Sequence, residues 1–144
     1  MCIRDRGTSV RAGRTSFEEV LKLCTVLMIG CPLDDETRDM FTAVELQKMR
    51  KDSMLINVAR GGIVNEDNLV KALDDGWIAA AATDVFVTEP ATAETSPLIR
   101  NFPKNLTLSP HTAWYADASI ERLQVMIKSV VEGYVSGTLH NMVN

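Results

Sequence analysis

Hydrophobic residues fall in four short runs, separated by longer stretches in which apolar and polar positions follow a helical period. Short continuous apolar runs are typical of parallel strands that are buried on both faces of a sheet. The pattern therefore predicts four such strands, over residues 25–31, 53–58, 78–85 and 106–109. The alanines of the third run further indicate close helix packing on both of its sides.

Helix signals lie before and between the predicted strands and after the last of them. Ser16 and Thr42 each stand three residues before a glutamate, the capping-box arrangement that opens a helix. Asn65 precedes another amphipathic stretch, which Gly76 ends, and a long amphipathic helix is predicted over residues 117–136. Strands that alternate with helices predict an α/β fold with a mostly parallel sheet.

Composition narrows the possible partners and location. The 144 residues include 15 Lys and Arg against 19 Asp and Glu, a net charge of −4, which argues against nucleic acid or an anionic membrane surface as partner. No apolar run reaches the ~18 residues that a membrane span needs, and the start is too polar for a signal peptide. The three cysteines include no CxxC pair, so neither a disulfide framework nor a metal site is expected, and a cytoplasmic location fits.

Three charged side chains, Arg60, Glu89 and His111, each follow a predicted strand. The carboxyl ends of parallel strands form the edge at which such sheets bind ligands. Each residue has an ordinary interpretation by itself: an exposed cation, a solvated loop carboxylate and a histidine that caps a turn. Together they form a reactive set, because arginine can hold a carboxylate through two hydrogen bonds and histidine exchanges protons near neutral pH. A glutamate beside the histidine would raise the histidine pKa by favouring the imidazolium form.

The same residues lie in segments that resemble a known protein family. In chain order, the segments are residues 30–33 (GCPL), 36–38 (ETR), 55–62 (LINVARGG), 84–86 (DVF), 89–90 (EP) and 109–113 (SPHTA). Together, at these intervals, they resemble the NAD-binding segment of the D-isomer-specific 2-hydroxyacid dehydrogenases. The resemblance extends from about Ser16 to Gly137.

The resemblance implies hydride transfer between NAD, or alternatively NADP, and C2 of a small 2-hydroxy or 2-keto acid. It implies that Arg60 grips the substrate carboxylate, that His111 exchanges the proton and that Glu89 orients His111. Asp84 would contact the nicotinamide carboxamide, and Trp114 would border the keto-acid pocket. Besides Arg60, Asp84 and His111, the implied cofactor contacts are Cys31, Pro32, Thr37, Val58, Ala59 and Ala113.

One part of the family pattern has no counterpart in the sequence. Neither the glycine-rich GxGxxG turn nor the acidic residue about 20 positions after it is present. The expected fold is therefore an incomplete Rossmann-like, doubly wound sheet from the carboxyl-terminal part of a longer protein. Its expected parts are a non-native or disordered start (1–15), a partial NAD-binding domain (16–115), and a helix and tail that would return to the substrate domain (116–144).

Two other interpretations of function stay open. Residues 110–115 and 118–119, with Asn141, Val143 and Asn144, are also similar to the C-terminal binding proteins, NAD(H)-responsive transcriptional corepressors of the same fold. Hydroxypyruvate and glyoxylate reductases of the family can share such a tail. An inactive truncated product is the second alternative. Trp114 has an alternative of its own, which is to pack against the start of the long helix. The family also implies a homodimer for the full-length protein.

Overall fold

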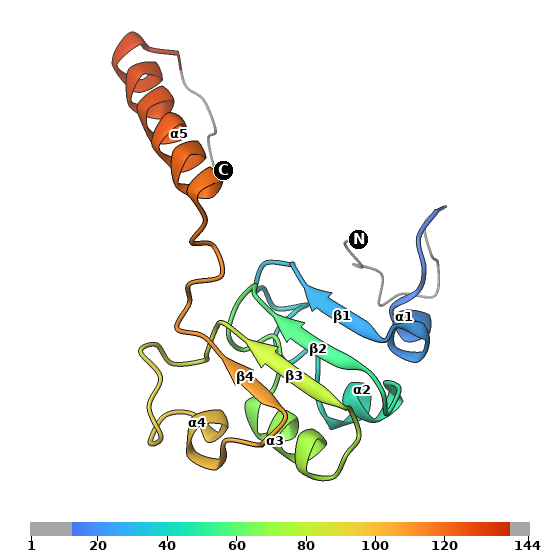
Figure 1. Cartoon of the computed structure of the whole chain (residues 1–144). Coiled ribbons are helices and arrows are strands. Elements are labelled where there is room, and N and C mark those ends of the chain that lie inside the picture. Colours follow the sequence, from blue (N-terminus) through green and yellow to red (C-terminus); the bar gives the residue numbers. More distant parts are fainter. Residues whose placement is uncertain (1–12, 139–144) are drawn as a thin grey trace. The chain divides into compact units, whose positions relative to one another are not determined.

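The computed structural model describes residues 13–138 and divides the chain into two compact units, between His111 and Thr112 (Figure 1). Within the described range, the first unit holds a sheet and its helices, and the second holds one long helix. Most of the predicted start and the last residues of the predicted tail, residues 1–12 and 139–144, lie outside the described range.

The predicted parallel sheet is confirmed. Its four strands pair in chain order, each parallel to the next. They are β1 (Val26–Ile29), β2 (Met54–Asn57), β3 (Ala80–Thr83) and β4 (Leu106–Leu108). The register aligns their last residues, Ile29, Asn57, Thr83 and Leu108, across the sheet. The four segments that follow the strands therefore leave from one edge, where the candidate residues were predicted to gather.

Four helices form a single layer against the sheet: α1 (Phe17–Leu23), α2 (Ala43–Lys48), α3 (Glu66–Asp74) and α4 (Pro97–Asn101). Each packs against the next, α1 on α2, α2 on α3 and α3 on α4. Strands that pair in chain order with right-handed crossovers place all their connecting helices on one side. The hydrophobic core lies between this layer and the sheet, where Leu27, Leu55 and Leu106 are buried.

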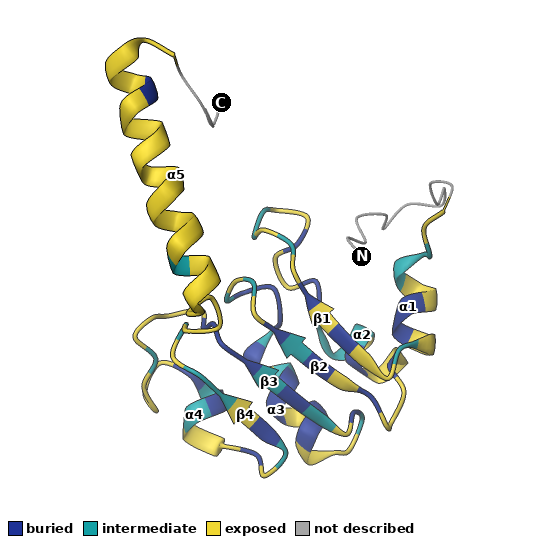
Figure 2. Ribbon diagram, turned by 45° about the horizontal axis from the view of Figure 1, so that its top comes forward, coloured by how far each residue is buried: buried dark blue, intermediate teal, exposed yellow. Residues whose placement is uncertain are grey.

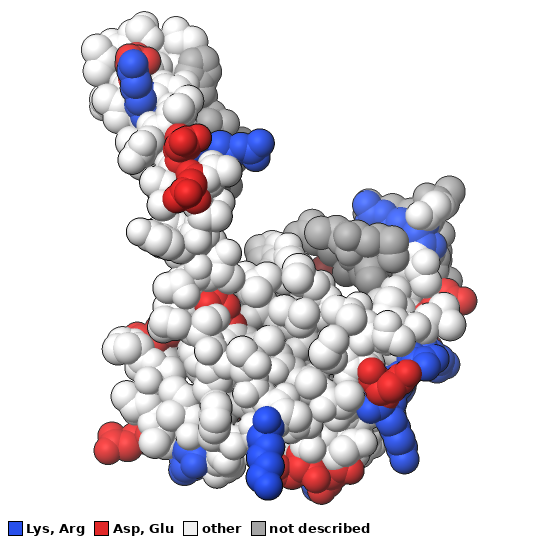
Figure 3. Space-filling model, viewed as in Figure 1, with Lys and Arg blue, Asp and Glu red and all other residues white. Residues whose placement is uncertain are grey.

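Burial on both faces of the sheet was predicted and is wrong for this structure. β1 and β2 alternate, with Val26, Met28 and Met54 exposed and their neighbours Leu27 and Leu55 buried (Figure 2). The reason is the single helix layer, which covers only one of the two faces that strand residues alternately point to. In the view of Figure 3, the charged side chains of the first unit lie mostly along its rim.

Local helix signals were mostly interpreted correctly. Both predicted capping boxes are formed, by Ser16 with Glu19 and by Thr42 with Glu45. Asn65 caps α3 through its side chain, as expected. The helix α4 was not predicted from the sequence, although a proline in the first turn is itself a helix-start signal.

The second unit contains α5 (Asp117–Ser136), which confirms the predicted long helix. It ends at Gly137, whose φ of 78° is left-handed, the conformation that makes glycine the usual helix stop. No helix within residues 13–138 is both long enough and apolar enough to cross a membrane.

Candidate active site

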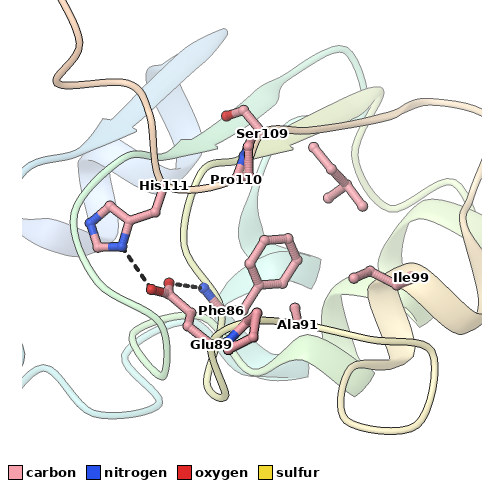
Figure 4. Close-up of a pocket in the computed structure, with 9 residues that line it drawn as sticks. Phe86, Glu89, Ala91, Ile99, Ser109, Pro110 and His111 are labelled. Carbon is pink, nitrogen blue, oxygen red and sulfur yellow. Dashed lines mark hydrogen bonds and ion pairs between the residues drawn. The ribbon is translucent and has the colours of Figure 1, made fainter.

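Glu89 and His111 form an ion pair at the carboxyl edge of the sheet (Figure 4). The Nδ1 atom of His111 lies 2.7 Å from Oε2 of Glu89, and Oε1 of Glu89 accepts a hydrogen bond of 2.9 Å from the backbone N–H of Phe86. These bonds, that to His111 first, hold the pKa of the Glu89 carboxyl below its usual value. The structure thus brings together two of the three predicted catalytic residues, from loops that follow different strands.

The backbone of His111 is left-handed, with φ of 56°. Such a conformation is uncommon outside glycine, although histidine adopts it more readily than most residues. Residues held in sparsely populated conformations persist where the surroundings determine them, and they cluster at functional sites. The hydrogen bond to Glu89 is one contact that holds the imidazole of His111 in place.

A cavity of about 410 Å³ adjoins the ion pair. Its wall is apolar on the side away from the pair, where Phe86, Ala91 and Ile99 face the hollow (Figure 4). Among the described residues that line it, Glu89 and His111 are the only ionisable ones. The Glu89–His111 pair thus lies at the edge of a pocket whose opposite wall is apolar.

Arg60 lies at a different hollow, which follows β1 and β2. This hollow has a volume of about 280 Å³, and its lining comprises Gly30, Cys31, Pro32, Val58, Ala59 and Arg60. The Arg60 side chain is exposed and donates to the carbonyl of Ala59, 2.7 Å away. Five of the predicted cofactor and substrate residues are therefore together here, while the structure shows no ion pair or hydrogen bond between Arg60 and the Glu89–His111 pair among the described residues.

Asn57, which the sequence analysis did not single out, holds the Arg60 loop. Its side-chain nitrogen donates to the carbonyl of Arg60 at 3.0 Å, and its side-chain oxygen accepts from the N–H of Ala59 at 3.1 Å. The signal for it was available, since a buried amide at the end of an otherwise apolar strand needs polar partners.

Asp84 and Thr37 are both buried. The Asp84 carboxylate, just after β3, accepts a hydrogen bond from the hydroxyl of Ser109, just after β4. The Thr37 hydroxyl donates to the carbonyl of Pro32 at 2.8 Å and also bonds the side chain of Asp34 at 3.0 Å. Thr37 thus stabilises the loop that carries Pro32, and its predicted contact with a cofactor stays a prediction.

Ala113 and Trp114 belong to the second unit. The Trp114 ring packs edge-on against Tyr115, with ring centroids 5.5 Å apart. Their predicted parts in cofactor and substrate binding stay predictions.

Comparison with known proteins gives one consistent result. The sequence profile described as "D-isomer specific 2-hydroxyacid dehydrogenase, NAD binding domain" matches residues 4–113. A glyoxylate reductase of Aeropyrum pernix is 40% identical over 134 residues, which are 90% of this chain and 38% of that protein.

Solved structures agree with the sequence comparison. A D-isomer specific 2-hydroxyacid dehydrogenase of Lactobacillus delbrueckii ssp. bulgaricus, solved in an NAD complex, matches with a TM-score of 0.77 at 29% identity; the match covers 90% of this chain and 43% of that one. A D-lactate dehydrogenase of Aquifex aeolicus, complexed with NAD and lactic acid, matches with a TM-score of 0.75 at 30% identity; the match covers 86% and 41%.

The match covers between 21% and 41% of the length of the curated relatives. The matched residues include both hollows of the first unit and the Glu89–His111 pair. The chain therefore belongs to the D-isomer specific 2-hydroxyacid dehydrogenase family, and residues 4–113 correspond to its NAD binding domain.

Proposed function

We propose that this chain forms the NAD-binding part of an enzyme that transfers a hydride between NAD(H) and C2 of a D-2-hydroxy acid or its 2-keto acid. The observation that carries the proposal is the ion pair of Glu89 and His111 at the strand ends of the family's NAD binding domain. The activities named for the relatives, such as glyoxylate reductase, belong to the same reaction class.

In this proposal His111 moves the proton. Reduction of a keto acid needs a proton at the carbonyl oxygen, and oxidation of a hydroxy acid needs a base at the same oxygen. Glu89 contacts the Nδ1 side of the imidazole, and Nε2 is the ring atom proposed to exchange the proton with the substrate oxygen. A carboxylate in this position orients the ring.

Arg60 is proposed to bind the substrate carboxylate. Its guanidinium is exposed and, apart from one bond to the carbonyl of Ala59, has donors left for a ligand. A planar guanidinium matches a carboxylate through two parallel hydrogen bonds. The side chain of Asn57 bonds the backbone of Ala59 and Arg60, so the loop that carries the guanidinium is held in one conformation.

The residues of the second hollow fit the nicotinamide half of a dinucleotide. Gly30, Cys31, Val58 and Ala59 give it small walls at the carboxyl ends of two adjacent parallel strands, where ligands of open α/β sheets bind. The buried Asp84 carboxylate at the end of the next strand is suited to accept from a carboxamide. When bound, NAD supplies the hydride acceptor, or NADH the donor, and the protein supplies binding and orientation. The two solved neighbours described above hold NAD, and NADP is the alternative cofactor in this proposal.

Kinetics of a chimeric reductase test the proposal. In the chimera, this chain replaces the segment that it matches in the Aeropyrum pernix glyoxylate reductase. Oxidation of NADH by glyoxylate or hydroxypyruvate should be measurable and should be lost when His111 is replaced by alanine. The unmodified reductase controls for assay conditions, and circular dichroism shows that the chimera is folded. A folded chimera whose turnover is indifferent to the His111 substitution would contradict the assignment.

The remaining parts of the proposal concern the setting of the whole protein. We propose a homodimer, which the family resemblance supports, and a cytoplasmic location, which the cysteine content supports. Size-exclusion chromatography with light scattering would test the first, and fractionation of cells would test the second.

A further inference from the structure

Glu66 is a buried carboxyl group that the proposed reaction does not use. It lies in the first turn of α3, and only 8% of its surface is exposed. Buried ionisable side chains are rare unless their oxygen atoms have hydrogen-bond partners. Both carboxyl oxygens of Glu66 have such partners, and both partners lie in the segment that contains Glu89.

The two bonds hold opposite ends of one loop. Oε1 of Glu66 accepts from the backbone N–H of Val87 at 2.9 Å, and Oε2 accepts from the hydroxyl of Ser96 at 2.6 Å. Val87 stands two residues before Glu89, and Ser96 is the residue from which α4 begins. One side chain of α3 thus fixes the loop over residues 87–96 where it leaves the sheet and where it enters the next helix.

The Glu89 carboxylate depends on the same backbone. Its second oxygen accepts from the N–H of Phe86, the residue next to Val87. A displacement of the peptide between Phe86 and Val87 would therefore change the position of Glu89 relative to His111. The bond between Glu89 and His111 is short, at 2.7 Å, and hydrogen bonds weaken steeply as geometry departs from ideal.

We infer that Glu66 is a positioning residue for the Glu89–His111 pair, which it serves by clamping the loop over residues 87–96. The catalytic importance of the Glu89–His111 pair rests on the proposed function. The two hydrogen bonds by which Glu66 holds the loop are observed in the structure. Glu66 does not contact the pair itself, so its effect passes through the backbone of Val87. A merely structural Glu66 would affect the stability of the fold and leave the pair unchanged.

Two substitutions of Glu66 separate position from charge. Glu66→Gln keeps the shape, because an amide oxygen can accept from Val87 while the amide nitrogen donates to the Ser96 hydroxyl. Glu66→Ala removes both bonds. Asp67→Ala is the matched control, since Asp67 stands beside Glu66 in the first turn of α3 and is exposed.

The readout is the pKa of the Glu89 carboxyl, followed in the 144-residue chain by ¹³C NMR of glutamate side chains. Its resonance is identified by its loss in Glu89→Gln. In the parent chain the pKa should lie below the ordinary glutamate value of about 4.3. It should rise toward that value in Glu66→Ala and stay at the parental value in Glu66→Gln and Asp67→Ala. Should Glu66→Ala fail to fold, Ser96→Ala removes one of the two bonds and should give a smaller rise in the same direction.

The outcomes distinguish this inference from the proposed function. If the Glu89 pKa is lowered in the parent chain and stays equally low in Glu66→Ala or Ser96→Ala, the positioning role of Glu66 is overturned and the ion pair is not. An equal rise in Glu66→Gln and Glu66→Ala would also overturn that role, because glutamine keeps both hydrogen bonds and their loss could then not be the cause. An ordinary Glu89 pKa in the parent chain would overturn the ion pair and the clamp together.

Discussion

Gly61 lies with its backbone directly against the carbonyl of Phe86. A Cβ atom built on Gly61 would be 1.9 Å from that oxygen and 2.6 Å from the nitrogen of Val87. Gly61 follows Arg60 in the loop after β2, and Phe86 belongs to the loop after β3 that carries Glu89. Two of the three loops that carry predicted catalytic residues therefore meet backbone to backbone, at a separation that only glycine permits.

Replacement of Gly61 by alanine should be strongly destabilising. The new methyl group meets backbone atoms that cannot turn aside as a flexible side chain could. We expect a loss of about 3 kcal/mol in the free energy of unfolding, at the upper end for overpacking. Gly30→Ala is the control, because its Cβ would meet no atom within 4 Å. Urea denaturation measures the free energy of unfolding of both variants. Equal values would show that the loops after β2 and β3 can move apart without cost.

Glu89→Gln should show a pH-dependent loss of stability. The pKa of Glu89 is lowered in the folded chain, first by the bond to His111 and then by the Phe86 N–H. A lowered carboxyl pKa stabilises the fold above the ordinary value of about 4.3, and that stabilisation is lost as pH falls through the lowered value. The difference in unfolding free energy between parent and variant should therefore be largest near neutral pH and shrink in acid.

Denaturation with urea at a series of pH values measures this difference. Glu94→Gln, which removes an exposed glutamate from the same loop, controls for the general effect of one charge. A difference between parent and Glu89→Gln that grows as the pH falls would have the wrong sign and would exclude the pair as its cause.

His111→Ala should abolish reduction of the keto acid in the chimeric reductase and leave NADH binding nearly intact. The imidazole is expected to meet the substrate oxygen and not the adenosine half of the cofactor. Loss of a general acid should lower kcat by about 10²–10⁴-fold. Stopped-flow measurement of hydride transfer, beside a fluorescence titration with NADH, separates the two effects; parental turnover in the variant would remove His111 from the reaction.

Arg60→Lys should not act as a conservative substitution. Lysine keeps the positive charge but lacks the planar fork that binds a carboxylate through two hydrogen bonds. In the chimera, KM for the keto acid should rise and kcat should fall. Steady-state kinetics that stay within about twofold of the parent would show that Arg60 has a structural role only.

The 144-residue chain by itself should bind NADH weakly. The pyrophosphate of a dinucleotide usually lies on a glycine-rich turn at a helix N-terminus, and the sequence contains no GxGxxG turn. The hollow beside Arg60 offers contacts to one half of the cofactor. Those contacts must offset the translational and rotational freedom lost on binding. Calorimetric titration should therefore detect no binding at low micromolar NADH, and binding in that range would refute this account of the phosphates.

The sequence by itself determined the local elements and the residue types of the site. Capping residues such as Ser16 and Thr42 act within one turn of their own helix, so their effect can be recognised without tertiary contacts. The four apolar runs likewise identified the strands of the parallel sheet, because a run of apolar residues is also a local feature of the sequence. The sequence also identified Glu89 and His111 as candidates, because both follow predicted strands and lie in the matching motifs.

Tertiary structure alone decided which of these residues meet and which surfaces are covered. Glu89 contacts His111 but Arg60 lies at another hollow, although all three carry the same sequence signal. Glu66 and its exposed neighbour Asp67 are equivalent in sequence, and only the fold directs one of them into the loop over residues 87–96. The face with Val26 and Met28 is exposed because helices cover one side of the sheet. An apolar run in the sequence shows that its side chains favour burial. The tertiary fold determines which of those side chains are covered by other elements.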